Sequence, residues 1–391
     1  MDLSENVKER VLDYRVRLEL INLAMAKEMG KACDQRHIEL LRFLHMEKEV
    51  CSLTLVELEA LLLDPNGQKG ADAFPALKIE PVIDRVNPPE NGRQTAIQAK
   101  RTHRIITWGG IGDVLLITPS IRALKQREPG CKIHVYCMSK SHKEVLINNK
   151  YIDRLLYVGP LGAIYHLLIP SIKSKFRWPN YGMLSPSLFY RENASAVIGE
   201  MLGVKVDDTR PDCFLTEEED RAAGKIVSAY SNPVALHATA KSSPNKNWPA
   251  ENWEKLVSNN PNYSFLQLGL ANEELVRGAI DFRGTSLRQA FGVIKAAGAF
   301  VGVDSVFAHA ATAFHVPAVV LFGASTPAVW GHTANINLYN PPRCSPCIDL
   351  LGGQPCPHGR ACMSNITVSD VERALFSLLA PTWNSKSDLD Q

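Results

Sequence analysis

A glycine-rich turn directly follows a short β-type run and opens an apolar helical pattern. The run 104–108 leads into Gly109-Gly110-Ile111-Gly112-Asp113. Missing side chains in such a turn let a ligand approach the backbone amides at a helix start. The segment lacks the Lys-Ser/Thr pair of a P-loop and the glycine spacing of a dinucleotide site. A purely structural turn, with Asp113 favoured in the first helical turn by the helix dipole, remains an alternative.

A lysine and a hydroxyl follow another predicted strand, at residues 234–237. Thr239 comes first, and Lys246 lies in the polar loop behind it. A lysine with backbone amides can neutralise the charge that grows on a departing diphosphate, without a metal ion. A solvated loop lysine is the alternative interpretation of Lys246.

Three polar residues mark the junction of a predicted strand, 299–303, with a helix. Asp304 ends the strand and Ser305 opens the helix, so the hydroxyl and the first free amides can meet a phosphate. His309 can bind a phosphate or a sugar. The alternatives are a helix cap for Asp304 and a buried, satisfied helix histidine for His309.

Glu273 follows the predicted strand 264–268 within Gly269-Leu270-Ala271-Asn272-Glu273. An acidic residue of a nucleotide-binding unit often accepts a ribose hydroxyl, and we expect the nucleotide here. An exposed glutamate at a helix start is the alternative.

Four of the nine cysteines are clustered: Cys344, Cys347, Cys356 and Cys362. Four thiolates can surround one zinc or iron ion tetrahedrally, although only the first spacing is typical of such sites. The segment therefore predicts a structural zinc or iron site. Free thiols or a redox-dependent disulfide remain open.

The elements around these residues predict an α/β fold. From residue 102 onward, β-rich runs alternate with amphipathic helices, which is typical of parallel sheets wrapped by crossover helices. Two such units are expected, at 102–215 and 216–383. Besides the strands above, we expect strands at 132–137, 154–158 and 318–322, and helices at 114–127, 143–148, 216–230, 251–257, 287–297 and 307–314. Ligands of open α/β sheets bind at the carboxyl ends of strands, where most candidate residues lie.

The N-terminal part has a different pattern. Residues 1–64 predict an α-helical domain, whose last helix opens with a capping box at Thr54 and Glu57. Residues 65–101 are rich in Pro, Gly and Asn and predict a linker. The helical domain can dock to a partner or self-associate through an apolar face.

Composition excludes several classes of protein. The chain of 391 residues has a formal net charge of +2, with basic residues spread along it, so we expect no nucleic-acid partner. No apolar run reaches the roughly 18 residues that span a bilayer, and Met1–Arg10 has no signal-peptide core. We expect a cytoplasmic protein.

Three segments, in order, resemble the bacterial heptosyltransferase family that acts on lipopolysaccharide, glycosyltransferase family 9. Gly112–Pro119 with Leu124-Lys125 is similar to its Gly-Asp-x4-Thr-Pro-x4-Leu-Lys signature. His237-Ala238-Thr239 with Lys246-Asn247-Trp248-Pro249 is similar to the loop after the first strand of its second lobe. Val303–His309 is similar to its Asp-Ser/Thr-Gly-x-x-His segment, except at Val306, where the family has glycine.

The resemblance implies two facing Rossmann-like lobes, the GT-B arrangement, and inverting, metal-independent transfer of heptose from ADP-heptose. The acceptor is a hydroxyl of lipopolysaccharide core or a related glycan, at the inner face of the inner membrane. Asp113 is the expected catalytic base. Thr239, Lys246, Glu273, Asp304, Ser305 and His309 are the expected donor-binding residues, with Gly110 and Gly112 in the glycine turn. The alternatives are a protein O-heptosyltransferase and a non-catalytic sugar-nucleotide-binding or assembly protein, which Val306 allows.

Overall fold

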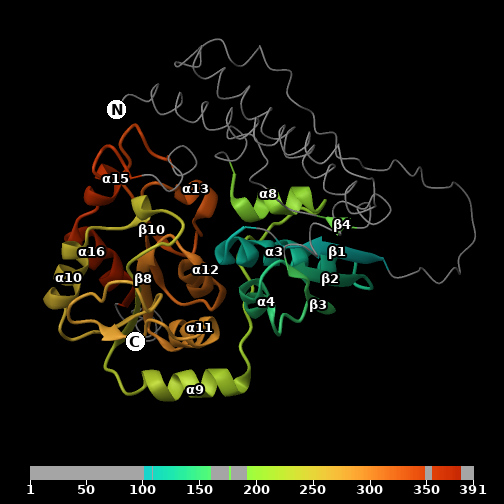
Figure 1. Ribbon diagram of the computed structural model, residues 1–391, viewed down its shortest axis with the longest axis horizontal. Helices are drawn as coiled ribbons and strands as arrows, with labels where there is room; N and C mark the ends of the chain where they lie inside the picture. Colours follow the sequence, from blue (N-terminus) through green and yellow to red (C-terminus); the bar gives the residue numbers. More distant parts are fainter. Residues whose placement is uncertain (1–100, 108, 160–175, 178–191, 348–354, 380–391) are drawn as a thin grey trace, which may run out of the picture. The chain divides into compact units, whose positions relative to one another are not determined.

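The computed structural model describes residues 101–107, 109–159, 176–177, 192–347 and 355–379 (Figure 1). The chain divides into two compact units, Met1–Arg101 and Thr102–Gln391. The first unit lies outside the described residues, and so do the helical domain and the linker expected there.

The first sheet has four parallel strands in the order β3-β2-β1-β4 (Figure 1). Its strands are β1 (Thr102–Ile106), β2 (Lys132–Cys137), β3 (Arg154–Tyr157) and β4 (Phe176–Arg177). The helices that accompany it are α3 (Ile111–Arg127), α4 (Lys140–Leu146) and α8 (Ala194–Met201). Helix α3 has Asp113 in its first turn and Lys125 and Arg127 in its last, as the helix dipole favours.

The second sheet has six parallel strands in the order β10-β9-β8-β5-β6-β7. They are β5 (Pro233–His237), β6 (Ser264–Gln267), β7 (Ile280–Asp281), β8 (Ala299–Val303), β9 (Ala318–Phe322) and β10 (Ile336–Tyr339). Every residue of β8 and β9 is buried, which is expected of central parallel strands covered on both faces.

Helices cover both faces of this sheet. They are α9 (Glu217–Val227), α10 (Ala250–Asn259), α11 (Leu287–Ala296), α12 (Val306–Ala313), α13 (Pro327–Trp330), α15 (Ala361–Ser364) and α16 (Val368–Leu379), with a 3₁₀ turn at Pro244–Lys246. Helix α9 starts with a capping box, in which Thr216 and Glu219 exchange hydrogen bonds. None of the described helices is both long and apolar enough to cross a bilayer.

The hydrophobic core joins the two sheets. One buried cluster runs continuously from Ile105 and Leu115 around the first sheet to Phe291 of α11 and Phe307 of α12. A second cluster, which includes Trp253 of α10 and Leu375 of α16, fills the opposite face of the second sheet. Full burial of one such side chain contributes about 1.5–3 kcal/mol. The shared core holds α12 against α3.

Two arginines anchor the segment that connects the sheets. Arg122 of α3 pairs with Asp212 and donates to the carbonyl oxygens of Asp208 and Arg210. Arg288 of α11 pairs with Glu219 and donates to the carbonyl oxygen of Phe214 at 2.8 Å. Arg210 itself contacts His315, which lies between α12 and β9, so the connection is bound to both halves of the fold.

The predicted alternation of strands and helices is confirmed. Both sheets are parallel, and each strand expected between residues 104 and 322 is present within two residues of its expected ends. Each helix expected from residue 114 onward is present within three residues of its expected ends. The prediction missed β4, α8, β7, α13, β10, α15 and α16, because it assigned no element to the segments that contain them.

Candidate active site

The glycine turn positions Asp113. Oδ2 of Asp113 accepts a 2.6 Å hydrogen bond from the backbone N–H of Gly110. Gly109 has a φ of +80°, which favours glycine, and a Cβ there would collide with the Asp113 carboxylate. The turn therefore holds the carboxylate against its own backbone at the start of α3.

Helix α4 supports this turn through His142. Nδ1 of His142 lies 2.8 Å from the hydroxyl of Thr107, and its Nε2 lies 3.2 Å from the carbonyl oxygen of Gly109. Because a carbonyl only accepts, the proton of His142 resides on Nε2. Burial lowers the pKa of His142, although the Gly109 carbonyl opposes the shift, so the ring is neutral at physiological pH.

The turn meets the second sheet at Gly112. A Cβ on Gly112 would lie 3.2 Å from Cδ2 of His309 and 3.7 Å from Cα of Val306, both on α12. A side chain at residue 112 would press on His309, so glycine suits this close approach of α3 to α12. Asp113, the next residue, is thereby brought to the polar residues that follow the strands of the second sheet.

A buried ion pair lies at the carboxyl ends of those strands. Nζ of Lys246 is 2.8 Å from Oδ2 of Asp304, and the same oxygen accepts a 2.7 Å hydrogen bond from the hydroxyl of Ser325. Lys246 is 9% exposed and Asp304 is 2% exposed. Burial alone would raise the pKa of Asp304, but the charge of Lys246 and these hydrogen bonds hold it below its ordinary value. Asp304 is therefore ionised.

A chain of polar contacts runs beside the ion pair. The hydroxyl of Thr239 donates to Oε2 of Glu273 at 2.6 Å, and the same oxygen lies 4.0 Å from Nε2 of His237. Nδ1 of His237 is 2.9 Å from the hydroxyl of Ser305. Burial lowers the pKa of His237 to about 3, so its ring is neutral. Three of the expected donor-binding residues are thus linked through His237.

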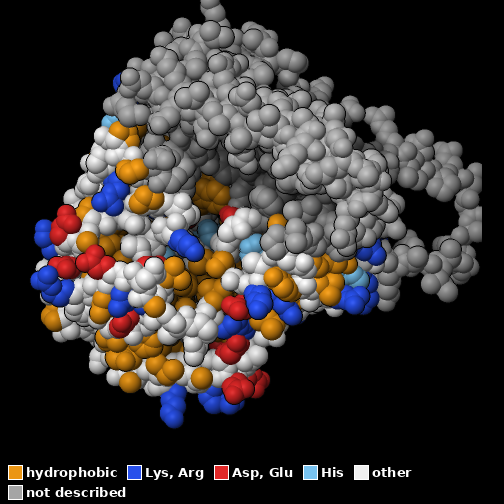
Figure 2. Space-filling model, in the orientation of Figure 1, with side chains coloured by type: hydrophobic (Ala, Val, Ile, Leu, Met, Phe, Trp, Pro, Cys, Tyr) orange, Lys and Arg blue, Asp and Glu red, His pale blue; other side chains and the backbone are white. Residues whose placement is uncertain are grey.

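A second histidine accompanies His309. Nδ1 of His309 lies 2.8 Å from Nε2 of His332, which belongs to the loop after α13. Burial lowers the pKa of His309 to about 4 and that of His332 to about 3. Both rings are therefore neutral. In Figure 2, histidine side chains are visible in the recessed middle of the face shown.

These contacts decide among the structural alternatives. Lys246 is not a solvated loop residue, since it is buried against Asp304. Asp304 is not a helix cap, because its carboxylate contacts Lys246 and Ser325. Glu273 begins no helix, and its side chain is only 14% exposed. His309 is a buried helix histidine, as the alternative held, with His332 as its partner.

The four clustered cysteines do not form an assembled metal site. Tetrahedral thiolate ligation at about 2.3 Å places sulfur atoms about 3.8 Å apart. No three of the Sγ atoms of Cys344, Cys347, Cys356 and Cys362 lie within 4.8 Å of one another among the described residues. The expected site is therefore not present as a preformed cage. Cys347 and Cys362 are buried, and Cys344 and Cys356 are partly exposed.

The cysteine segment nevertheless contacts both loops of the ion pair. The N–H of Cys356 donates to Oδ1 of Asn245 at 2.9 Å, next to Lys246. The N–H of Cys347 donates to the carbonyl oxygen of Ala324 at 2.8 Å, next to Ser325. The segment thus supports the site structurally.

One group of possible metal ligands lies elsewhere in the described part of the chain. Side-chain atoms of His103, Glu128 and Cys131 all lie within 4.8 Å of one another. Nε2 of His103 is 2.9 Å from Oε2 of Glu128, and Arg127 binds the other carboxylate oxygen. Burial raises the pKa of Cys131, so its thiol is protonated. An ion pair accounts for this group.

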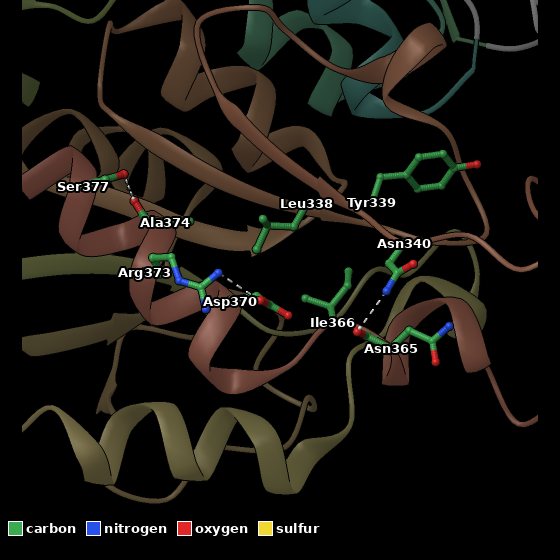
Figure 3. A pocket seen from close by; sticks show the side chains of 9 residues that line it. All are labelled: Leu338, Tyr339, Asn340, Asn365, Ile366, Asp370, Arg373, Ala374 and Ser377. Carbon is green, nitrogen blue, oxygen red and sulfur yellow. Dashed lines mark hydrogen bonds and ion pairs between the residues drawn. The ribbon is translucent and has the colours of Figure 1, made fainter.

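A pocket of about 510 Å³ also lies away from the candidate residues. It is bounded by β10 and α16, where Tyr339, Asn365 and Asp370 line it (Figure 3). The carboxylate of Asp370 is bound by Thr367 and by Arg373. None of the expected site residues contributes to this pocket.

Sequence reasoning missed three polar residues of the site: His237, Ser325 and His332. His237 is the last residue of β5 and Ser325 comes three residues after β9, and this position at a strand end was a usable signal. No sequence pattern marked His332, because only the fold brings it to His309.

Comparisons with known proteins indicate which family the chain is similar to. Residues 190–349 match the model of Glycosyltransferase family 9 (heptosyltransferase), which covers all six expected donor-binding residues. The predicted resemblance is confirmed for this segment, which is a glycosyltransferase domain. No curated protein matches the chain.

Solved structures show the same fold at low sequence identity. A family 9 glycosyl transferase from Veillonella parvula is 18% identical, with a TM-score of 0.55, covering 71% of this chain and 97% of its own. The ADP-heptose lipopolysaccharide heptosyltransferase II of E. coli is 17% identical, with a TM-score of 0.54 and coverages of 71% and 98%. The dodecameric iron-containing heptosyltransferase TibC of E. coli, in complex with ADP-D-beta-D-heptose, is 17% identical, with a TM-score of 0.56 and coverages of 72% and 76%.

Proposed function

We propose that the chain is an inverting, metal-independent glycosyltransferase of GT-B arrangement that transfers heptose from ADP-heptose to a hydroxyl of lipopolysaccharide core or a related glycan. The observation that supports it most strongly is the approach of the Asp113 turn to α12, beside the buried Lys246–Asp304 pair. In this arrangement Asp113 acts as the base and Lys246 as the cation at one reaction centre. In this proposal the protein works in the cytoplasm, at the inner face of the inner membrane.

In the proposed reaction, Asp113 takes the proton of the acceptor hydroxyl as that oxygen attacks the anomeric carbon. Attack on the face opposite the leaving group inverts the anomeric configuration, and the bond to ADP breaks. General-base assistance of this kind contributes about 10²- to 10⁴-fold to the rate. The carboxylate accepts one hydrogen bond from Gly110, which orients it.

Lys246 stabilises the departing ADP. An ammonium has three N–H donors, and Asp304 takes one of them while fixing the side chain in place. Because Asp304 and Ser325 preorganise the lysine, little reorganisation is needed as charge develops on the diphosphate. Ser305 and His309 are at the start of α12, where the helix N-terminus favours anions. Glu273, oriented by Thr239, accepts a ribose hydroxyl.

Calorimetric titration with ADP-heptose, ADP-glucose and UDP-glucose tests the donor. We expect selective binding of ADP-heptose, undiminished in Asp113→Asn, which keeps an oxygen for the Gly110 N–H. Transfer by Asp113→Asn to a lipopolysaccharide-core acceptor should be lost. Absence of binding to all three donors would overturn the proposal.

Val306 supports a second candidate, a non-catalytic sugar-nucleotide-binding protein. Valine stands at the first position of α12, close to Gly112, where the resembling family has glycine. A valine side chain at this position crowds a phosphate more than glycine does, and a donor held slightly out of place could bind without reacting. This candidate would be favoured if the protein binds the donor but releases no ADP in the presence of acceptor, and if Val306→Gly restores the release of ADP. A protein hydroxyl as acceptor would appear as heptosylated protein in the same assay.

The four cysteines remain a proposed structural site for iron or zinc. The two-residue spacing of Cys344 and Cys347 suits a shared metal ion, and Cys347 and Cys362 are buried. The metal content of the purified wild-type protein is compared with that of the double variant that carries Cys344→Ser and Cys356→Ser. Stoichiometric metal that the double variant loses would support the site, whereas less than a tenth of an equivalent would refute it.

A further inference from the structure

The buried histidine pair determines which ring nitrogen of His309 carries a proton. Nδ1 of His309 and Nε2 of His332 are 2.8 Å apart, and the residues are 4% and 5% exposed. Two nitrogen atoms at this distance share one hydrogen, which one ring donates and the other accepts. Since both rings are neutral, only two arrangements are possible.

The free nitrogen of His332 distinguishes these arrangements. Nδ1 of His332 is buried and has no hydrogen-bond partner among the described residues. If His309 donates, Nδ1 of His332 carries a hydrogen that meets no acceptor. If His332 donates, Nδ1 carries only a lone pair. Buried N–H groups without an acceptor are rarer than under-satisfied acceptors, so the second arrangement is the more stable one.

The consequence for His309 lies at its other nitrogen. With Nδ1 accepting from His332, the hydrogen of His309 must be on Nε2. That nitrogen lies 3.6 Å from the position of a Cβ on Gly112, so it is at the junction of α12 with the glycine turn. In the opposite tautomer Nε2 would present a lone pair, which repels the oxygens of a diphosphate because these accept only.

We propose that His332 is a positioning residue that holds His309 in the Nε2–H tautomer, so that His309 donates a neutral hydrogen bond to a diphosphate oxygen of the nucleotide-sugar donor. This inference rests on the proposed function for the identity of the ligand. The assignment of the tautomer rests on the histidine pair alone.

The charged groups around the pair fit this role. Asp304 and Lys246 both act electrostatically on His309, and Asp304 also acts on His332. They neutralise each other through their ion pair. A neutral donor at His309 therefore adds a directional hydrogen bond to the charge that Lys246 supplies.

The tautomer is measured in the free protein, whatever its activity. Two-bond ¹H–¹⁵N correlation spectra of protein labelled at histidine distinguish Nδ1–H from Nε2–H, and His309→Gln assigns the signal. We expect His309 as a single Nε2–H tautomer in the wild type and in His332→Gln, whose amide N–H replaces that of Nε2. In His332→Leu we expect a mixture of tautomers. A wild-type His309 that is Nδ1–H or charged at pH 7.5 overturns the proposal.

The ligand contact is tested with ADP as the probe. Saturating ADP should shift the Nε2 resonance of His309 in the wild type and in His332→Gln. If ADP binds by calorimetry but leaves this resonance unchanged, the contact with the diphosphate is refuted while the proposed function stands. If ADP does not bind, the proposed function fails and takes the ligand contact with it, although the tautomer result holds independently.

Kinetics separate positioning from mere structural support. His332→Leu should lower kcat/KM for the donor about tenfold, mainly through KM, and His332→Gln should recover most of the loss. In a His309→Gln background, His332→Leu should add no further loss. Equal losses with and without His309 would show that His332 only supports the fold. Should His332→Leu not fold, the wild-type spectrum and His332→Gln decide the question.

Discussion

Nζ of Lys246 and Oδ2 of Asp304 are 2.8 Å apart at a position where both side chains are buried. Each charge is compensated only by the other and by nearby polar groups. Removal of one partner leaves an uncompensated buried charge, which typically costs 3–5 kcal/mol. Loss of donor binding in a Lys246 variant therefore has two causes that must be separated.

Lys246→Met should lower the free energy of unfolding by about 3–5 kcal/mol, because Asp304 is left charged without a partner. Lys246→Met combined with Asp304→Leu should recover most of that stability. Urea denaturation measures the free energy of unfolding of both variants. Lys241 is an exposed loop lysine, so Lys241→Met serves as the control and should change this free energy by less than about 0.5 kcal/mol. Equal losses in the single and the double variant would contradict the pairing.

Asp113→Asn should reduce kcat by about 10²- to 10⁴-fold while the dissociation constant of the donor stays within about twofold. The amide oxygen still accepts from the Gly110 N–H, so the turn is kept, but the side chain no longer takes a proton. Single-turnover transfer assays and calorimetry give the two quantities. A variant with full activity would remove Asp113 from the reaction.

Gly109→Ala should destabilise the turn and abolish transfer, because φ is +80° and the new methyl group collides with the Asp113 carboxylate. Gly130→Ala is the matched control, since a Cβ there meets no atom within 4 Å. We expect the control to match the wild type in transfer rate and in thermal midpoint. Unchanged transfer by Gly109→Ala would show that the carboxylate needs no such positioning.

The protein should lose stability as the pH falls below about 6.5. Burial lowers the pKa of His237 to about 3, that of His309 to about 4 and that of His332 to about 3, whereas the unfolded chain takes up protons near 6.5. Since the unfolded state binds more protons between these values, acid favours unfolding. This stabilisation is complete above pH 6.5 and is lost progressively toward pH 4.

Each of these histidines contributes up to about 1.4 kcal/mol per pH unit in that window. Denaturation in urea at pH 7.5, 6.0 and 5.0 measures the slope. His332→Gln removes one titrating ring and should make the slope shallower by a comparable amount. A free energy of unfolding that stays constant from pH 7.5 to 5.0 would show that the rings are not buried neutral.

The fold could be predicted from the alternation of apolar runs and helical patterns. Strands such as Ala299–Val303 and Ala318–Phe322 are apolar throughout, and the structure buries them fully. Strand ends located the candidate residues, because parallel strands place their carboxyl ends at one edge. The partnerships could not be predicted in the same way. Lys246 and Asp304 lie far apart in the sequence, and nothing in either local pattern indicates that they share a hydrogen bond.

The contact of Gly112 with His309 was beyond prediction for a related reason. It depends on how α3 packs on α12, which the shared core determines. His332 lies in an irregular loop, where neither helical nor strand periodicity assigns a direction to a side chain. The arrangement of the four cysteines could not be predicted either, because spacing along a loop does not fix the distances between sulfur atoms.

The connecting segment links the two sheets through several polar contacts. Residues 208–212 are held to α3 by Arg122, and Phe214 and Glu219 are held to α11 by Arg288. Two further contacts cross between the halves, because the guanidinium of Arg210 lies 2.9 Å from Nε2 of His315 and Arg288 also donates to the carbonyl oxygen of Glu144. A rotation of one sheet against the other would therefore have to exchange these polar contacts together with the packing of Gly112 on His309, and it could not turn about one residue alone.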